Sequence, residues 1–302
     1  MNTLAPITVI MPLHDQRQFL LRAVKSVLNQ TWRNLELVVV DDGSADGGAD
    51  LLRPVDDPRL RCLRTECRGP GAARNTGARE SESRWLAFLD ADDEWEPTFL
   101  EKAADAMVRA PDTVLVYCDV RARGAAARRR DIGSGVIADY FGARMRHGVA
   151  VSSSSNLLRR DAFVASGGFP ETYRYAEDIE TWLRLACRGP FYFLSEPLSI
   201  IEVADRARIT RRAGALQRAH GLRQLHESFL RLLATGAIPE PQVSGCRRFM
   251  QQQRGLEAMH LASAGRRRDA LRALRDVPFG AHTWRAYARC LRQMLLPSGV
   301  GS

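Results

Sequence analysis

The sequence predicts an α/β fold, in which helices flank a mostly parallel sheet, followed by a helical C-terminal region. Three continuous apolar runs, at 7–13, 35–40 and 85–89, have the composition of strands that are covered on both faces. Helical patterns lie between these runs, and strand and helix alternate as far as about residue 118. The chain has 302 residues, of which 45% are hydrophobic, so a core of this kind can form.

The helices of the first part are predicted from apolar spacing and from glycine. In 18–30, apolar residues recur on one face of a helix. The glycine-rich stretch 69–81 leads into a second helix, and 98–107 has the pattern of a third. The apolar run at 113–118 is the next strand.

After residue 118, strand and helix patterns no longer alternate regularly. The small, basic stretch 121–135 predicts an exposed loop, and 150–163 predicts a return to extended structure before a turn at Gly167-Gly168. A helix is expected at 176–189, with Gly189 as its stop signal, and one or two strands at 191–203.

The last third of the chain differs from the rest in charge. Residues 1–202 hold 26 Lys and Arg against 29 Asp and Glu, whereas 203–302 hold 18 against 6. We therefore expect two parts, a domain at 1–202 and a basic, mainly helical region at 203–302 with a break at 236–242.

Basic charge of this kind suits nucleic acid, an anionic membrane or an acidic partner. Arginines near the C-terminus are mixed with Trp284, Tyr287, Leu291, Leu295 and Leu296. Basic amphipathic helices with aromatic residues often lie on membrane surfaces. A membrane contact and a helical cap or homodimer face both stay open for this region, and nucleic acid is not expected.

Several classes of protein are disfavoured by composition. The N-terminus lacks the pattern of a secretory signal, and no run of about 18 apolar residues suggests a membrane span. The six cysteines form no Cys-x-x-Cys pair, so the sequence predicts neither a zinc site nor a disulfide framework. We expect a cytoplasmic protein with reduced thiols, peripheral at most on the inner face of the membrane.

Polar side chains follow each of the three apolar runs, at 12–15, 41–44 and 90–93. Because ligands gather at the carboxyl ends of strands in such sheets, these residues predict one shared site. Asp90 and Asp92 point the same way in an extended chain and can share a cation, for which Mg²⁺ or Mn²⁺ suits their hard oxygen ligands. Glu94 and Glu96 are expected to favour the start of the following helix instead.

Six stretches of the sequence then carry a resemblance to a known family. In order they are VIMPLHD, VVVDDGSADGG, GPGAARNTGA, FLDADDEW, GGFPE and YAEDIETWLRL, within roughly residues 5–202. Their order and spacing resemble the family 2 glycosyltransferases, which are inverting, nucleotide-sugar-dependent enzymes. The resemblance implies the GT-A fold, a Rossmann-like, mostly parallel sheet, and dependence on Mn²⁺ or Mg²⁺.

The resemblance also implies a donor site. Asp42 matches the position that binds the nucleotide base, usually uracil, and Pro12 and His14 line the same pocket. Arg74 matches the arginine near the base and phosphates, although an arginine alone on a helix is as often solvated.

Further along the chain, the resemblance implies that Asp90 faces the ribose and that Asp92 is a metal ligand. Asp93 is their neighbour at the donor. Asp178 matches the catalytic base, which takes the proton of the acceptor hydroxyl. Glu177 and Ser155 are weaker matches on the acceptor side. For Glu177 and Asp178 the alternative role is capping of a helix N-terminus.

The chain departs from the family pattern at three places. His14-Asp15 stands where relatives usually have Tyr-Asn. Gln251–Gly255 lacks the Trp of the processive motif, so we expect transfer of a single sugar. A loop that carries Arg-x-His in many relatives has no histidine here. Arg206, Arg208 or Arg211 could bind the diphosphate instead, or they could form a solvated basic face.

Two other functions remain open from the residues alone. A nucleotidyltransferase on a similar sheet is disfavoured because the first strand leads to MPLHDQ rather than to a glycine-rich loop with lysine. A non-catalytic module could bind membrane or nucleic acid through the basic tail. The acceptor stays open between a glycan, a lipid-linked sugar, a peptide and a small molecule.

Overall fold

The computed structural model of the chain describes residues 6–128, 130–203 and 214–275, together with 277, 287, 288 and 292. Within these residues, nine strands form a single sheet. The strands are β1 (Ile7–Leu13), β2 (Leu35–Asp42), β3 (Leu60–Thr65), β4 (Trp85–Phe88), β5 (Glu94–Trp95), β6 (Leu115–Ala122), β7 (Gly135–Ile137), β8 (Asn156–Arg159) and β9 (Phe191–Ile201).

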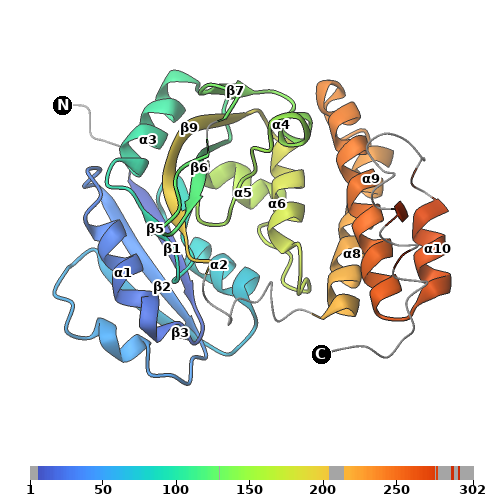
Figure 1. Cartoon of the computed structure of the whole chain (residues 1–302). Helices are drawn as coiled ribbons and strands as arrows, with labels where there is room; N and C mark the ends of the chain where they lie inside the picture. The colour runs from blue at the N-terminus through green and yellow to red at the C-terminus, as the bar shows by residue number, and fades with distance from the viewer. Residues whose placement is uncertain are drawn as a thin grey trace.

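Helices flank the sheet and continue beyond it at the C-terminal end (Figure 1). They are α1 (Arg17–Leu28), the 3-10 helix η1 (Ala49–Leu52), α2 (Pro70–Arg79), α3 (Phe99–Arg109), α4 (Tyr140–His147), α5 (Arg160–Ser166), α6 (Glu177–Ala186), α8 (Ala215–Ala234), α9 (Glu240–Ser263) and α10 (Arg267–Arg275).

The strand order is β3-β2-β1-β4-β8-β6-β9-β5, and β7 pairs with β9. The first four strands are parallel to one another, and β8 runs antiparallel between β4 and β6. The chain reverses its direction of progress along the sheet between β1 and β4, which is where α/β sheets place their ligands. The predicted α/β fold with a mostly parallel sheet is thus confirmed.

Successive residues of β1, β2 and β4 contribute to two different cores, because side chains alternate across a sheet. In β1, Ile10 belongs to the core that α2, α5 and α6 cover. Its neighbours Val9 and Met11 belong to the core that α1 and α3 cover. This double coverage explains why the strand sequences are continuously apolar.

The core on the α6 side extends into the C-terminal helices. Leu222 and Phe229 of α8 and Phe249 and Met250 of α9 are buried in the same apolar cluster as the strand residue Phe88. Figure 1 shows α8 beside α6, with α10 on the outer side of the molecule. The predicted break in the tail is confirmed by the residues between α8 and α9.

Two predicted elements differ from the structure. In 150–163 only β8 is extended, because serine hydroxyls bond local backbone groups before it and favour turns, and α5 follows it at once. The helix expected at 176–189 ends at Ala186. Gly189 is a point of close approach, since a Cβ there would lie 2.7 Å from Val114 Cγ1.

The expected role of Glu94 and Glu96 at a helix start is wrong. Glu94 lies in β5 and pairs with Arg22, at 2.7 Å, and with Arg123. Glu96 pairs with Arg121 at 2.7 Å, and α3 begins only at Phe99, after Pro97. Basic side chains from α1 and from the end of β6 therefore hold these two acids.

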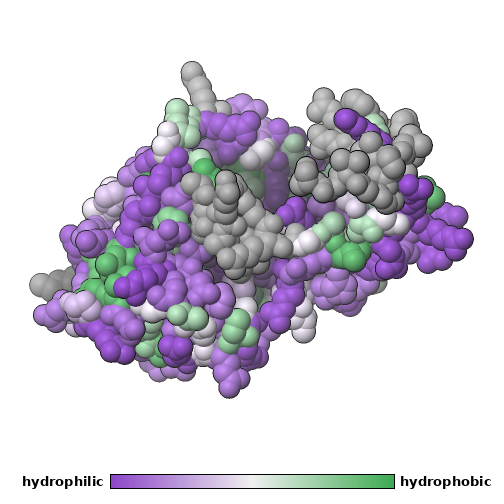
Figure 2. Space-filling view, turned by 60° about the horizontal axis from the view of Figure 1, so that its bottom comes forward, coloured by the Kyte–Doolittle hydropathy of each residue, from purple (hydrophilic) through white to green (hydrophobic). Residues whose placement is uncertain are grey.

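One face of the described surface is mainly polar. Figure 2 shows hydrophilic side chains over most of the face that it presents, with small apolar patches among them. None of the described helices is long and apolar enough to cross a membrane.

Gly77 sets how closely α2 approaches β1. A Cβ at this position would lie 2.5 Å from Ile10 Cγ2 and 3.1 Å from Ile10 Cγ1. We expect Gly77→Ala to lower the free energy of unfolding by about 1–3 kcal/mol through overpacking, although alanine favours helices. Urea unfolding should show this loss, whereas Gly133→Ala, where a Cβ would meet nothing within 4 Å, should leave stability unchanged. Equal stability of both variants would contradict the close contact.

Candidate active site

The carboxyl ends of β1 and β2 meet as predicted. His14 Nδ1 lies 2.9 Å from the Asp42 carbonyl oxygen, and Pro12 is partly exposed beside Val40 in the sheet register. Asp15, with a φ of 51°, bonds the next loop twice, through Ser44 Oγ and the Ala45 amide. The two strand-end loops therefore form one surface.

Asp42 is buried and its carboxylate already has partners within the chain. Oδ1 accepts from Thr65 Oγ1 at 3.1 Å and from the Arg68 amide at 3.0 Å, and Oδ2 accepts from the Gly69 amide at 2.7 Å. Gly69 has a φ of 99° and precedes α2. Asp42 therefore fixes the loop that leads into the helix carrying Arg74.

The third strand end brings three acids together. Ligand oxygens of Asp90, Asp92 and Asp93 all lie within 4.8 Å of one another. The Asp90 amide donates to Ser154 Oγ at 3.0 Å, and Asp93 Oδ1 accepts from the Glu202 amide at 2.8 Å. A set made only of carboxylate oxygens fits a hard divalent cation such as Mg²⁺ or Mn²⁺.

Arg74 joins this cluster to the other side of the site. Its guanidinium is buried, with 4% of the side chain exposed. Nη2 donates to Asp90 Oδ1 at 2.5 Å, and Nη1 lies 3.5 Å from Glu177 Oε1. The Phe169 ring lies under the guanidinium, 5.2 Å from Cζ to the ring centroid. Arg74 is therefore an interior ion-pair partner rather than a solvated helix residue.

Glu177 and Asp178 begin α6, directly after Ala176, which has a φ of 65°. Burial and the neighbouring Asp178 raise the pKa of Glu177 to about 7, against the lowering effect of Arg74. Burial also raises the pKa of Asp178, while the Ile179 amide and Arg144 lower it. The structure thus gathers two partly desolvated carboxyl groups beside Arg74.

Ser155, predicted on the acceptor side, is fully buried. Its Oγ accepts from the Ser152 amide at 2.9 Å, and its carbonyl oxygen accepts from the Cys118 amide. Its neighbour Ser154 bonds the Asp90 amide and Trp95 Nε1. The serine loop therefore supports the acid cluster from inside, and Ser155 is not at an open surface.

Sequence reasoning missed the role of Asn75. Its amide nitrogen donates to the Phe169 carbonyl at 2.8 Å, and its Oδ1 accepts from the Phe169 amide at 2.8 Å. Asn75 thereby holds the ring that covers Arg74. The position of Asn75 directly after Arg74 in the AARN stretch was the available signal. Its partner Phe169, however, lies 94 positions further along the chain.

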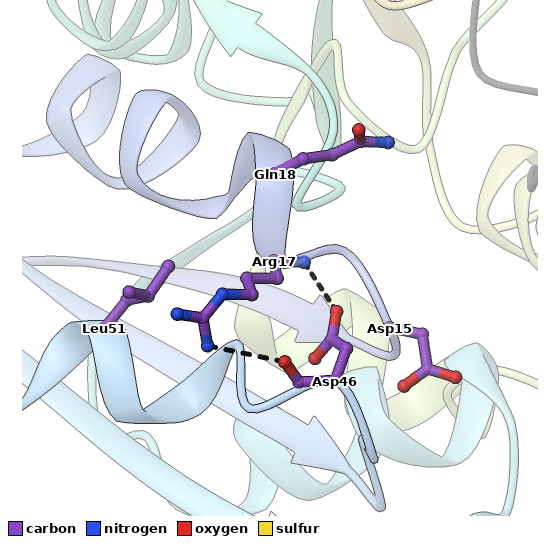
Figure 3. A pocket seen from close by; sticks show the side chains of 5 residues that line it. All are labelled: Asp15, Arg17, Gln18, Asp46 and Leu51. Atoms are coloured by element: carbon purple, nitrogen blue, oxygen red, sulfur yellow. Dashed lines mark hydrogen bonds between the residues drawn. The ribbon is translucent and has the colours of Figure 1, made fainter.

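A pocket of about 410 Å³ opens beside the strand ends and is lined by Asp15, Arg17, Gln18, Asp46 and Leu51 (Figure 3). The Arg17 amide donates to Asp46 Oδ2 at 2.8 Å. None of the carboxyl groups around Arg74 lines it, so it adjoins the candidate active site without containing its acids.

Some predicted residues lie outside the described residues. They are Arg206, Arg208 and Arg211 of the expected phosphate loop, and Trp284, Leu291, Leu295 and Leu296 of the expected membrane face.

Comparison with known proteins gives a consistent picture. The model of the family described as Glycosyl transferase family 2 matches residues 8–164, about half of the chain. Escherichia coli WfaP, a UDP-Glc:alpha-D-GlcNAc-diphosphoundecaprenol beta-1,3-glucosyltransferase, is 25% identical over 189 residues, covering 61% of this chain and 71% of WfaP. The succinoglycan biosynthesis protein ExoO of Rhizobium meliloti is 35% identical over 122 residues, covering 38% of this chain but 35% of ExoO.

Solved structures show the same fold. Staphylococcus aureus TarS 1-349 in complex with UDP-GlcNAc superposes with a TM-score of 0.74 at 15% identity, covering 96% of this chain and 89% of that one. The mannosyltransferase PcManGT from Pyrobaculum calidifontis, in complex with GDP-Man and Mn2+, superposes with a TM-score of 0.62 at 20% identity. The match covers 99% of this chain and 89% of PcManGT.

The raised pKa of Glu177 predicts a pH-dependent stability. The folded protein binds this proton more tightly than the unfolded chain, whose value is near 4.5, so the stabilisation is complete below about 4.5 and lost as pH rises through about 7. In metal-free buffer, we expect Glu177→Gln to exceed the wild type in free energy of unfolding at pH 8 by about 2–3 kcal/mol, and to match it near pH 4.5.

Urea unfolding at the two pH values measures this difference. Glu82→Gln, at an exposed position before β4, should follow the wild type at both. A Glu177→Gln variant that is less stable than the wild type at pH 8 would contradict the desolvated state of the carboxyl group.

Proposed function

Because the chain belongs to glycosyl transferase family 2, we propose that it transfers a single sugar, with inversion, from a nucleotide-diphosphate sugar to an acceptor hydroxyl. A UDP-sugar is the proposed donor. Residues 1–202 are the catalytic domain in this proposal, and 203–302 the basic helical region.

The observation that carries the proposal is the position of Arg74 between Asp90 and Glu177. The guanidinium contacts both carboxylates, so the acids after β4 and those at the start of α6 lie close together. Donor and acceptor must be held close to each other for direct transfer. Asp90 and Asp93 then belong to the donor side, and Glu177 and Asp178 to the acceptor side.

Asp178 is the proposed general base. Its Oδ1 accepts from the Ile179 amide at 2.7 Å, which orients the carboxylate and leaves Oδ2 to take the acceptor proton. As that proton moves to Asp178, the acceptor oxygen bonds the anomeric carbon. The bond from this carbon to the phosphate oxygen breaks, and the electron pair leaves with the nucleoside diphosphate. The raised pKa of Asp178 favours its role as a base, because basicity rises with pKa.

Asp90 and Asp92 would hold the Mn²⁺ or Mg²⁺ ion, with Asp93 beside them. Such an ion, when bound, neutralises charge on the diphosphate. Pro12, His14 and Asp42 are proposed to bind the nucleotide base. The contact of His14 with the Asp42 carbonyl and the fixed Asp42 carboxylate support a preformed base pocket.

The acceptor is proposed to be a glycan or a lipid-linked sugar, since WfaP by its name uses GlcNAc-diphosphoundecaprenol. A contact with the inner face of an anionic membrane fits this acceptor. Exposed residues of α10 support the contact through four positive charges and one apolar side chain. They are Arg267, Arg268, Arg272 and Arg275, with Leu271.

Asp178→Asn should lower kcat by about 10²–10⁴-fold, because the acceptor proton loses its base. The affinity for UDP with Mn²⁺, measured by calorimetry, should stay within about threefold of the wild type. Asp112→Asn, at an exposed position before β6, serves as the control. Equal loss of turnover and of nucleotide binding would remove Asp178 from the role of base.

Asp92→Asn should weaken UDP binding in the presence of Mn²⁺ by about tenfold or more, because one anionic ligand of the ion is lost. Chelation by EDTA should stop transfer by the wild type, and added Mn²⁺ or Mg²⁺ should restore it. Asp105→Asn, on the exposed face of α3, should bind like the wild type. UDP affinity that is unchanged by EDTA and by Asp92→Asn would contradict a metal at this position.

A further inference from the structure

The turn before α6 has an unusual backbone. Ala176 has a φ of 65°, a left-handed conformation that residues with a Cβ seldom adopt, and only 5% of the residue is exposed. Such a conformation persists only where the surrounding structure imposes it. The next two residues are Glu177 and Asp178, so whatever holds Ala176 also sets the direction of the two carboxyl groups.

Helix α8 contacts this turn directly. Gly221 lies against the Tyr175 backbone, because a Cβ at this position would overlap the Tyr175 carbonyl oxygen and lie 3.0 Å from its carbonyl carbon. Gln217, one helical turn earlier, donates to the Arg174 carbonyl at 3.2 Å. Glycine disfavours helix interiors, and this close approach gives the physical reason for one here.

The same helix also holds α6 from the side. Ser228 Oγ donates to Glu180 Oε1 at 2.8 Å, and both residues are buried. Glu180 pairs with Arg184, whose guanidinium donates to the Gly168 carbonyl. From α9, Gln242 donates to the Ala186 carbonyl at 2.7 Å. Helix α6 is thus fixed near both of its ends by the C-terminal helices.

We propose that α8 is a positioning element for the catalytic base, with Gly221 and Ser228 as its positioning residues. Gly221 lets the helix press on the Tyr175 carbonyl and so keeps Ala176 left-handed. Ser228 fixes Glu180, one turn into α6. The proposal rests on the proposed function of Asp178 and gives the C-terminal region a catalytic role beyond its charge.

Gly221→Ala tests the contact with Tyr175, and Gly214→Ala is its control, since a Cβ at Gly214 would meet nothing within 4 Å. We expect Gly221→Ala to lower kcat by about tenfold or more, with the UDP affinity within about threefold of the wild type. The control should keep both within about twofold of the wild type.

The pH profile of kcat separates positioning from a loss of folded protein. Burial raises the pKa values of Glu177 and Asp178, and the charged groups that face them are Arg74, Arg144 and Asp90. A displaced turn admits water, so the acidic limb of the profile in Gly221→Ala should move to lower pH by about 0.5 unit or more. A smaller folded fraction would lower the rate at every pH without moving this limb.

Ser228→Ala keeps the proposal testable if Gly221→Ala does not fold. It should lower kcat by about threefold or more and move the acidic limb in the same direction, whereas Ser244→Ala, at an exposed position of α9, should change neither. The proposal is overturned if the folded variants match their controls in kcat and in the acidic limb.

Hydrogen exchange separates this proposal from the proposed function. Gly221→Ala, but not Gly214→Ala, should speed amide exchange in residues 173–180, a result that needs no substrate. If the wild type transfers no sugar from any nucleotide sugar tested, the proposed function fails, and exchange alone then decides whether α8 holds the turn. Equal exchange in the two glycine variants would overturn the contact.

Discussion

The site depends on one buried guanidinium that is placed between two groups of acids. Arg74 is held in the interior by its ion pair with Asp90, by its contact with Glu177 and by the Phe169 ring that covers its plane. The acids depend on it in turn, because carboxylates this close repel one another without a cation among them. The acid cluster after β4 and the start of α6 therefore contact the same charged group.

Strands β1, β2 and β4 follow from composition, because both faces of the sheet are covered there and each run is apolar throughout. β3 was not predicted, since an edge strand needs no second apolar face and its sequence, LRCLRT, is half polar. The meeting of the strand-end acids followed from topology rules. The link from Arg74 to Glu177 could not follow from local pattern, because 103 positions separate them and only the resemblance to a family related them.

The charged composition of the C-terminal region does not indicate that its helices share the core of the sheet. Its arginine excess gives no sign of apolar packing, but Leu222, Phe229 and Phe249 are buried in the core shared with the sheet. Most charged residues of these helices are exposed and dominate the composition, although the buried apolar residues determine where the helices pack. Contacts such as that between Gly221 and Tyr175 cannot be read from periodicity, because they depend on the three-dimensional approach of two backbones.

The division of the helices between the two faces of the sheet has a practical consequence. The chain has only two lysines, Lys25 on α1 and Lys102 on α3, and both helices cover the face opposite α2 and α6. Both side chains reach solvent, and that of Lys102 is 38% exposed. A reagent that couples to lysine side chains therefore attaches a support or a dye to the face that α1 and α3 cover. The opposite face, which carries Arg74, stays exposed to the solution.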